Sequence, residues 1–222
     1  MKVEKTITIT VTGVLTVTVK ADKSKTYTGE AVIFTVNWTP APYMIPPGCR
    51  VDISYGDGTS DTLDGMGTPV TFVKRYTKTG TMTVTASVYD HMTGASGSGS
   101  TTVQVATPLT VSFTADKTSG TVPLTVTFTF SMSGGYTPYT WVLDPGDGTT
   151  PYSNPTSPKS HTYNKTGTFT AKLTVTDALG ATAAAIAAPI AVGLPTEEIS
   201  KTAITAAAIG VGGILMLVGR RE

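Results

Sequence analysis

The sequence predicts an all-β protein with two tandem β-sandwiches and one transmembrane α-helix at its C-terminal end. Three observations support this prediction. One series of motifs occurs twice along the chain, each copy is rich in strands with alternating polarity, and a long stretch without charges lies near the end. The first two observations define the sandwiches, and the third defines the helix.

Composition limits the class of protein. The 222 residues suffice for one large or two small domains. The net charge is +1 and only 14% of residues are charged, so no broad basic surface is available for nucleic acid. Abundant threonine, valine, glycine and proline favour strands and turns. The single cysteine, Cys49, excludes an intrachain disulfide and a cysteine-based zinc site.

An internal repeat defines the domains. "YTKTGTMTVTASVYD" (residues 76–90) and "YNKTGTFTAKLTVTD" (residues 163–177) share eight of fifteen positions without a gap. Upstream, "LTVTVKADK" (residues 15–23) matches "LTVSFTADK" (residues 109–117), and a Gly-Asp-Gly triplet lies between the blocks in each copy. The chain therefore contains two copies of one domain, which we place at residues 14–106 and 107–193.

Each copy reads as all-β. "AVIFTVNW" and "TVTASV" in the first copy, and "LTVTFTF" and "FTAKLTV" in the second, alternate apolar with small or polar residues. This period of two is typical of half-buried strands, and the intervening "TG", "GG" and "GDG" segments indicate turns. No amphipathic helical pattern occurs before the C-terminal segment.

One set of motifs resembles a known family. "WVLDPGDG" (residues 141–148), followed by "HTYNKTGTFTAKLTVTDALG" (residues 161–180), is similar to the PKD domain, an immunoglobulin-like β-sandwich of cell-surface proteins. The second copy carries nearly the whole pattern. The first copy departs from it, with Val51 in the Trp strand and Arg75 at the place of His161. The resemblance implies two immunoglobulin-like sandwiches.

The Gly-Asp-Gly triplets are interpreted as structural turns. Their glycines allow a tight backbone, and their aspartates can bond their own backbone as Asx-turns. The residues concerned are Gly56, Asp57, Gly58, Gly146, Asp147 and Gly148. A phosphate-binding loop would need a following lysine or a helix N-terminus, and neither follows.

A calcium site is the alternative for the first turn. Four carboxylates, Asp52, Asp57, Asp61 and Asp64, lie within a short stretch of sequence. Calcium requires six or more oxygen ligands, however, and the sequence cannot show that these converge. We therefore expect a structural turn, with no bound metal and no cofactor.

The two histidines are not expected to be catalytic. His161 has no nucleophile nearby in sequence, and the resemblance implies that it packs near Tyr163. His91 lies in a polar loop and is expected to be exposed. No hydrolase, kinase or metalloprotease motif is present, so we expect a protein that is not an enzyme and has no small-molecule substrate.

Tryptophan and asparagine residues leave two further possibilities. Trp38 and Trp141 could bind sugar, but a tryptophan in an alternating strand more often packs in a sandwich core. Asn37 and Asn164 stand in Asn-x-Thr sequons, which accept glycans only in a glycosylating compartment.

A membrane anchor is expected near the C-terminus. Residues 202–219 contain no charge, and eighteen residues of helix span about 27 Å, the thickness of a bilayer core. The large apolar side chains expected to face lipid are Ile204, Ile209, Ile214, Leu215 and Leu217. A linker, residues 194–201, precedes this segment.

Two more features of the anchor concern its packing and orientation. Ala206 with Gly210, and Ala208 with Gly212, form small-xxx-small pairs that permit close helix–helix contact. The basic tail, residues 220–222, is expected on the inner side of the membrane, which places the sandwiches outside.

The N-terminal segment, residues 1–13, resembles the closing strand of a sandwich. Its Ile7, Ile9 and Val11 share one face of an alternating strand, and that face needs a cover. The strand could pair with an edge of the first sandwich, or with a neighbouring subunit by β-augmentation. The second option would make it an assembly element.

Together these features predict a non-enzymatic structural protein, a membrane-anchored stalk that belongs to a larger surface assembly. The expected partners are a lipid bilayer and other protein subunits. Residues 1–13 do not read as a signal peptide, which favours a virion component of an archaeal virus over a cell-surface protein. The alternative function is adhesion or carbohydrate binding from the same anchor.

Overall fold

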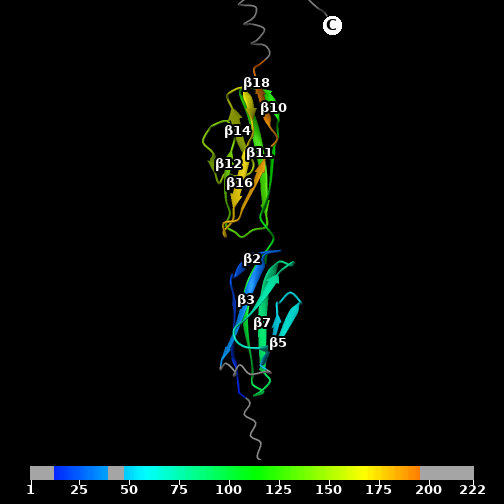
Figure 1. Cartoon of the computed structure of the whole chain (residues 1–222). Helices are drawn as coiled ribbons and strands as arrows, with labels where there is room; N and C mark the ends of the chain where they lie inside the picture. Colours follow the sequence, from blue (N-terminus) through cyan, green and yellow to red (C-terminus); the bar gives the residue numbers. More distant parts are fainter. Residues whose placement is uncertain (1–12, 40–47, 196–222) are drawn as a thin grey trace, which may run out of the picture. The chain divides into compact units, whose positions relative to one another are not determined.

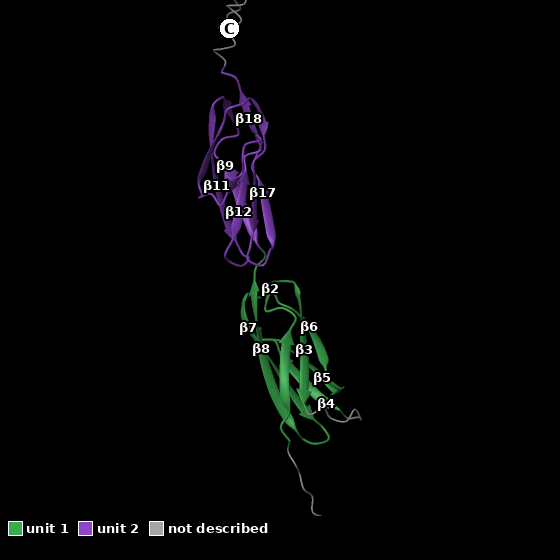
Figure 2. Ribbon diagram, turned by 90° about the vertical axis from the view of Figure 1, so that its left-hand side faces the viewer, with its two compact units in different colours: residues 1–108 green, residues 109–222 purple. Residues whose placement is uncertain are grey.

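The computed structural model describes residues 13–39 and 48–195 and separates the chain into two compact units. Unit 1 is residues 1–108 and unit 2 is residues 109–222 (Figure 2). The described residues form strands, turns and loops, with no helix among them. The all-β class is thus confirmed for this part of the chain. No helix in the described part could cross a membrane, and the anchor predicted at residues 202–219 lies outside it.

Unit 1 is a sandwich of a three-stranded and a five-stranded sheet (Figure 1). The three-stranded sheet has the order β1-β3-β6, from β1 (Thr16–Ala21), β3 (Ala31–Thr39) and β6 (Val70–Arg75). The five-stranded sheet has the order β2-β8-β7-β4-β5. Its strands are β2 (Lys25–Tyr27), β4 (Cys49–Ser54), β5 (Ser60–Met66), β7 (Gly80–Asp90) and β8 (Ser96–Ala106).

Unit 2 repeats this topology with its second layer divided. Its first sheet has the order β14-β11-β9, from β9 (Thr110–Ala115), β11 (Leu124–Ser133) and β14 (Lys159–Tyr163). The opposite layer consists of two sheets, β13-β12-β16-β17 and β10-β18-β15. Their strands are β10 (Ser119–Thr121), β12 (Thr140–Asp144), β13 (Tyr152–Ser153), β15 (Gly167–Phe169), β16 (Lys172–Thr176), β17 (Thr182–Ile186) and β18 (Ile190–Gly193).

The register shows that the two units are copies. Ala21 of β1 pairs with Phe34 of β3, and Ala115 of β9 pairs with Phe128 of β11. In both units a short early strand also pairs in parallel with the last strand: β2 with β8 in unit 1, and β10 with β18 in unit 2. The neighbouring strands within each three-stranded β1-β3-β6 and β14-β11-β9 sheet are antiparallel.

A β-bulge explains why the second layer of unit 2 is split. Lys172 pairs with Ile186, whereas Phe169 pairs with Ile190, so three steps along one strand face four along the other. The extra residue lies in the segment that contains Pro189, which has no backbone N–H to give to a ladder. In unit 1 the corresponding ladder is unbroken, since β7 pairs with β8 continuously from Gly80 to Tyr89. The register shift in that sheet lies between Cys49 and Val51, where β4 pairs with β5.

Each core follows from the alternation seen in the sequence. In β3, Val32, Phe34, Val36 and Trp38 are buried, while the residues between them are exposed or half-buried. Burying such a side chain contributes about 1.5–3 kcal/mol. Unit 2 has an equivalent core around Val126, Phe128, Leu143 and Leu173.

Candidate functional site

The Gly-Asp-Gly turns are the best-defined polar feature shared by both units. Gly56 and Gly146 have φ angles of +79° and +82°, a region that favours glycine. A Cβ on Gly56 would lie 2.6 Å from the carbonyl oxygen of Thr83, and one on Gly146 would lie 2.3 Å from that of Thr170. These two glycines let the turn press against the backbone of the neighbouring strand segment.

The aspartate of each turn bonds the residues that follow it. Oδ1 of Asp57 accepts from the backbone N–H of Thr59 at 3.0 Å and from its hydroxyl at 2.6 Å. Oδ1 of Asp147 accepts from the same groups of Thr149 at 3.1 and 2.6 Å. Both aspartates therefore make the Asx-turn expected from the sequence.

A buried tyrosine in each unit donates a hydrogen bond to the backbone just before the turn. The hydroxyl of Tyr76 donates to the carbonyl oxygen of Tyr55 at 3.1 Å, and that of Tyr163 donates to the carbonyl oxygen of Pro145 at 2.9 Å. Burial raises the pKa of Tyr76 and of Tyr163 to about 12. Both phenols therefore remain neutral donors over the physiological range.

The second oxygen of each aspartate meets a basic side chain. Nζ of Lys74 lies 2.8 Å from Oδ2 of Asp57, and Nε2 of His161 lies 2.9 Å from Oδ2 of Asp147. The expectation that Arg75 stands at the place of His161 is wrong. Val32 pairs with Lys74 just as Val126 pairs with His161, so Lys74 is the equivalent residue.

Alternation along β6 explains this correction. Arg75 points to the opposite side from Lys74, and its guanidinium donates to the carbonyl oxygen of Gly29 at 2.7 Å. Lys74 shares a face with Tyr76 and lies over two aromatic rings, 5.0 Å from the centroid of Tyr55 and 5.7 Å from that of Tyr76. Such cation–π contacts add to the ion pair.

The carboxylates respond to these partners. Burial alone would raise the pKa of Asp57, but hydrogen bonds from Lys74 and Thr59 outweigh it and lower the pKa to about 2. Burial also opposes ionisation of Asp147, and hydrogen bonds from Thr149 and His161 bring its pKa below the usual range. Both turns therefore hold an ionised aspartate with little exposure to water.

His161 makes one more contact than Lys74. Its Nδ1 lies 2.9 Å from the hydroxyl of Tyr152, and its ring packs edge-on against Tyr163 at 4.7 Å between centroids. The neutral imidazole can satisfy both polar contacts, because one nitrogen donates to Asp147 while the other accepts from Tyr152. The position beside Tyr163 agrees with the packing role that the resemblance implies.

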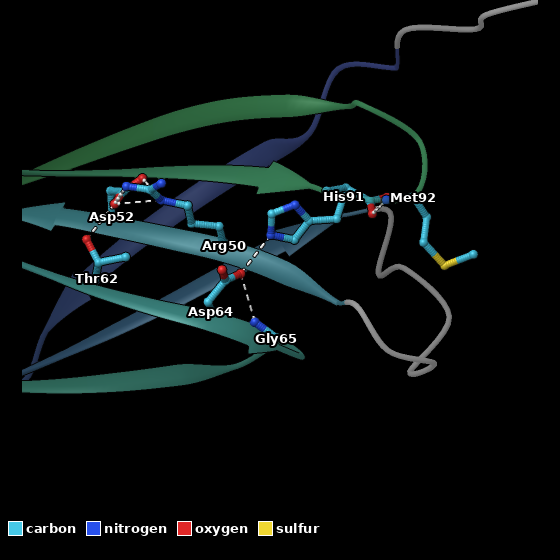
Figure 3. A network of polar contacts seen from close by, with 8 residues as sticks. Arg50, Asp52, Thr62, Asp64, Gly65, His91 and Met92 are labelled. Atoms are coloured by element: carbon cyan, nitrogen blue, oxygen red, sulfur yellow. Dashed lines mark hydrogen bonds and ion pairs between the residues drawn. The ribbon is translucent and has the colours of Figure 1, made fainter.

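The outer face of the five-stranded sheet in unit 1 carries a separate polar network (Figure 3). The guanidinium of Arg50 donates two hydrogen bonds of 2.9 Å to Asp52, which also accepts from the hydroxyl of Thr62 at 2.6 Å. Beside it, Nε2 of His91 lies 2.7 Å from Oδ1 of Asp64. His91 is exposed, as expected, but it also makes this polar contact with Asp64.

The four carboxylates of the calcium alternative have four different sets of partners. Asp52 bonds Arg50 and Thr62, Asp57 bonds Lys74 and Thr59, Asp61 accepts from the hydroxyl of Tyr55 at 2.6 Å, and Asp64 contacts His91. Among the described residues, no group of three His, Cys, Asp or Glu side chains could hold a metal ion. The structure therefore does not bring the four together.

A shallow groove of about 330 Å³ borders this network. Tyr89, which is 46% exposed, lines this groove together with three serines. The lining residues are Asp52, Ser87, Val88, Tyr89, Ser96, Gly97 and Ser98. The sequence alone does not reveal this groove, because its residues come from three strands that only the register brings side by side.

Both tryptophans pack in or against a core. Trp38 is buried in unit 1, and Trp141 packs against the core of unit 2 while its indole N–H donates to the carbonyl oxygen of Pro155 at 2.8 Å. Both therefore have the packing role that is common for a tryptophan in an alternating strand.

Other predicted residues lie outside the described part of the chain. They are the strand residues Ile7, Ile9 and Val11, and all lipid-facing and helix-packing residues of the anchor. Those predictions stay predictions.

Comparison with protein families identifies one domain. Residues 109–189 match the PKD domain, and this range covers nearly all described strands of unit 2. PKD domains are typically non-catalytic. A comparison with curated proteins found no match.

Solved structures similar to the chain are also β-sandwich proteins. One is the PKD domain of an M14-like peptidase from a Thermoplasmatales archaeon, with 21% identity, a TM-score of 0.32, and coverage of 42% of this chain and 93% of that one. Another is the PKD domain of the human receptor SorCS2, with 20% identity, a TM-score of 0.33, and coverage of 48% and 84%.

The amphioxus IgVJ-C2 molecule matches with 15% identity, a TM-score of 0.41, and coverage of 75% of this chain and 99% of that one. These low scores carry no argument by themselves. The family match and the motif geometry of Trp141, the Gly-Asp-Gly turn and the His161–Tyr163 pair support one conclusion: residues 109–189 of this protein form a PKD domain.

Proposed function

We propose that the protein is a non-enzymatic structural protein, a membrane-anchored stalk within a larger surface assembly, with its sandwiches outside the membrane. One observation carries the proposal: in both units the turn aspartate, the residue most suited to chemistry, is fully engaged in bonds within its own domain. Such a site maintains a fold, and its two carboxylates are not free to act on a substrate.

The sequence adds the anchor to this proposal. The uncharged stretch at residues 202–219 is followed by two arginines, which favours an outward position for everything before it. Two copies of one rigid domain in tandem, attached to a bilayer at one end, suit a spacer that holds a partner away from the membrane. A virion of an archaeal virus that contains a membrane is the setting we favour.

Membrane extraction tests the anchor. We expect the full chain to stay in the membrane pellet after a high-salt wash, and a chain without residues 199–222 to be released in folded form. As a control, Gly210→Ile with Gly212→Ile should stay in the pellet, because these changes keep the segment apolar. Release of the full chain by salt would contradict the anchor.

Removal of residues 1–12 tests the assembly role. We expect both units to keep their hydrogen-exchange protection while co-purification with other surface subunits is lost. A chain with Ile7→Asp, Ile9→Asp and Val11→Asp should behave in the same way, whereas changes of the alternate threonines to serine should not. Normal assembly without residues 1–12 would disprove this part of the proposal.

Carbohydrate binding is the second candidate function, and the groove beside Tyr89 favours it. A half-exposed aromatic ring next to hydroxyl and carboxylate groups is the kind of surface that sugars contact. A glycan array should show binding that Tyr89→Ala removes, while Tyr136→Ala serves as a control in the other unit. If the protein binds no glycan on the array, carbohydrate binding is rejected and only the structural role is kept.

A further inference from the structure

We propose that Asn164 is an N-glycosylation site and that the other two asparagines of the chain are not. The chain has three asparagines, and each has a threonine two positions later: Asn37-Trp-Thr, Asn154-Pro-Thr and Asn164-Lys-Thr. The sequence pattern excludes Asn154, because proline in the middle of a sequon prevents transfer. It does not separate Asn37 from Asn164, and the structure does.

Asn37 lies within a central strand. It is a half-buried residue of β3, which lies between β1 and β6, and it pairs with Thr18. The next residue, Trp38, is only 1% exposed, and its backbone N–H donates to the hydroxyl of Thr68 at 3.3 Å. A transferase could reach this sequon in the folded protein only if β3 left its sheet.

Asn154 is engaged as well as blocked by Pro155. Its side-chain oxygen accepts from the backbone N–H of Trp141 at 2.8 Å, and its own φ angle is +47°. It therefore shapes the turn beside the Trp strand. This residue serves as an internal example of an asparagine with a structural role.

Asn164 has the opposite surroundings. It follows β14 in the turn that leads to β15, and Asn164, Lys165 and Thr166 are all exposed. Its amide nitrogen makes one long contact, 3.5 Å to the carbonyl oxygen of Thr162. The whole sequon therefore lies in a surface turn, the setting in which a glycan is accepted.

A groove next to Asn164 can take the first sugar. It has a volume of about 350 Å³ and is lined by Val122, Pro123, Asn164 and Pro195. The proline rings and the valine offer apolar surface for the C–H face of a sugar ring. The site also lies beside Pro195, where the predicted linker continues toward the anchor.

Transfer of the glycan to Asn164 is a substitution at the sugar carbon C1 and needs no oxidant or reductant. Nδ2 of Asn164 attacks C1 of a sugar carried by a polyprenyl phosphate or pyrophosphate, a new C1–N bond forms, and the C1–O bond to the lipid phosphate breaks. The amide nitrogen loses one proton to a base of the transferase, and the lipid phosphate or pyrophosphate leaves as the second product. The host compartment supplies the lipid-linked oligosaccharide, and in this respect the inference rests on the proposed outward position of the units.

An acceptor assay on the full chain tests the inference apart from that position. The detergent-solubilised protein is incubated with a transferase that recognises Asn-x-Thr and with a lipid-linked oligosaccharide, and glycopeptides are quantified by mass spectrometry. We expect occupancy at Asn164 to exceed that at Asn37 by at least about tenfold in the folded protein, because an ordered central strand seldom opens. In the urea-unfolded and alkylated chain, both sequons should be modified.

Three variants complete the test. Asn164→Gln should abolish modification of this sequon, because the acceptor amide is lost. Thr166→Ser should remain modified, because serine keeps a functional sequon. Asn37→Gln should leave occupancy at Asn164 unchanged. Modification of Asn164 only after unfolding, or equal modification of Asn37 in the folded chain, would overturn the inference. Digestion of intact membranes with an external protease tests the proposed outward position separately.

Discussion

The two Gly-Asp-Gly turns differ in one partner and agree in almost everything else. Both have a glycine pressed against the neighbouring strand segment, an aspartate that bonds a following threonine, and a tyrosine hydroxyl below. Unit 1 neutralises the aspartate with Lys74 above two tyrosine rings, whereas unit 2 uses His161 between Asp147 and Tyr152. The backbone thus requires a bonded aspartate but accepts either an ammonium or an imidazole as its partner.

The hydrogen-bonded groups explain this tolerance. One carboxylate oxygen is used by the turn, so only the other needs a partner from the adjacent strand. A lysine reaches it with a flexible stem, and a histidine reaches it with a ring that must itself be oriented. Tyr152 supplies that orientation in unit 2, while unit 1 needs no equivalent residue.

The largest effect is expected from the shared part of the comparison. Gly56→Ala and Gly146→Ala should each destabilise their own unit by about 3 kcal/mol, because the new Cβ meets a backbone carbonyl and the φ angle is unfavourable. Gly58→Ala and Gly148→Ala meet no atom within 4 Å and should cost about 1 kcal/mol. Hydrogen-exchange mass spectrometry assigns each loss to a unit, and equal losses for all four variants would contradict the close approach.

The next effect concerns the cation of unit 1. Lys74→Met removes the partner of a nearly buried carboxylate and should destabilise unit 1 by about 3 kcal/mol. Adding Asp57→Asn should recover a large part of this loss, because no uncompensated charge is then buried. Chemical denaturation of the single and double variants measures the coupling, and simple additivity of the two changes would argue against a functional ion pair.

Acid should weaken unit 1 in a defined range of pH. The pKa of Asp57 is about 2, below its ordinary value of 3.8. A lowered pKa means that the stabilisation is complete above about pH 4 and is lost as the pH falls toward 2. The loss attributable to this group is roughly 2 kcal/mol. Unfolding free energies measured across this range should fall less steeply in Asp57→Asn, and an unchanged slope would disagree with the assignment.

The smallest effect is expected from exchanging Lys74 and His161, the two side chains that contact the turn aspartates. His161→Lys removes the imidazole that contacts the hydroxyl of Tyr152. Unit 2 also has Pro145 where unit 1 has Tyr55, so the new lysine lacks one of the two rings that Lys74 lies over. We therefore expect unit 2 to lose about 1 kcal/mol of unfolding free energy. Lys74→His should weaken unit 1 by a similar amount for want of an orienting hydroxyl. Thermal unfolding of both variants checks this, and a stabilised His161→Lys protein would show that Tyr152 is not needed.

The sequence predicts the fold well because its signals are local. Alternation identifies β3 and β7, and the repeated blocks identify the second copy. The repeat itself also points to Lys74, because the ungapped blocks that match Tyr76 with Tyr163 place Lys74, and not Arg75, opposite His161. The bulge near Pro189 and the groove beside Tyr89 depend on the register between distant strands, which no local pattern contains.

The parallel pairs β2–β8 and β10–β18 have a consequence for mechanical load. When a unit is pulled at its two ends, the early strand is drawn toward the N-terminal side and the last strand toward the C-terminal side. Because the two strands run in the same direction, they slide past each other, and their hydrogen bonds are loaded together in shear instead of opening one after another. Each unit is therefore expected to resist tension through this pair of parallel strands.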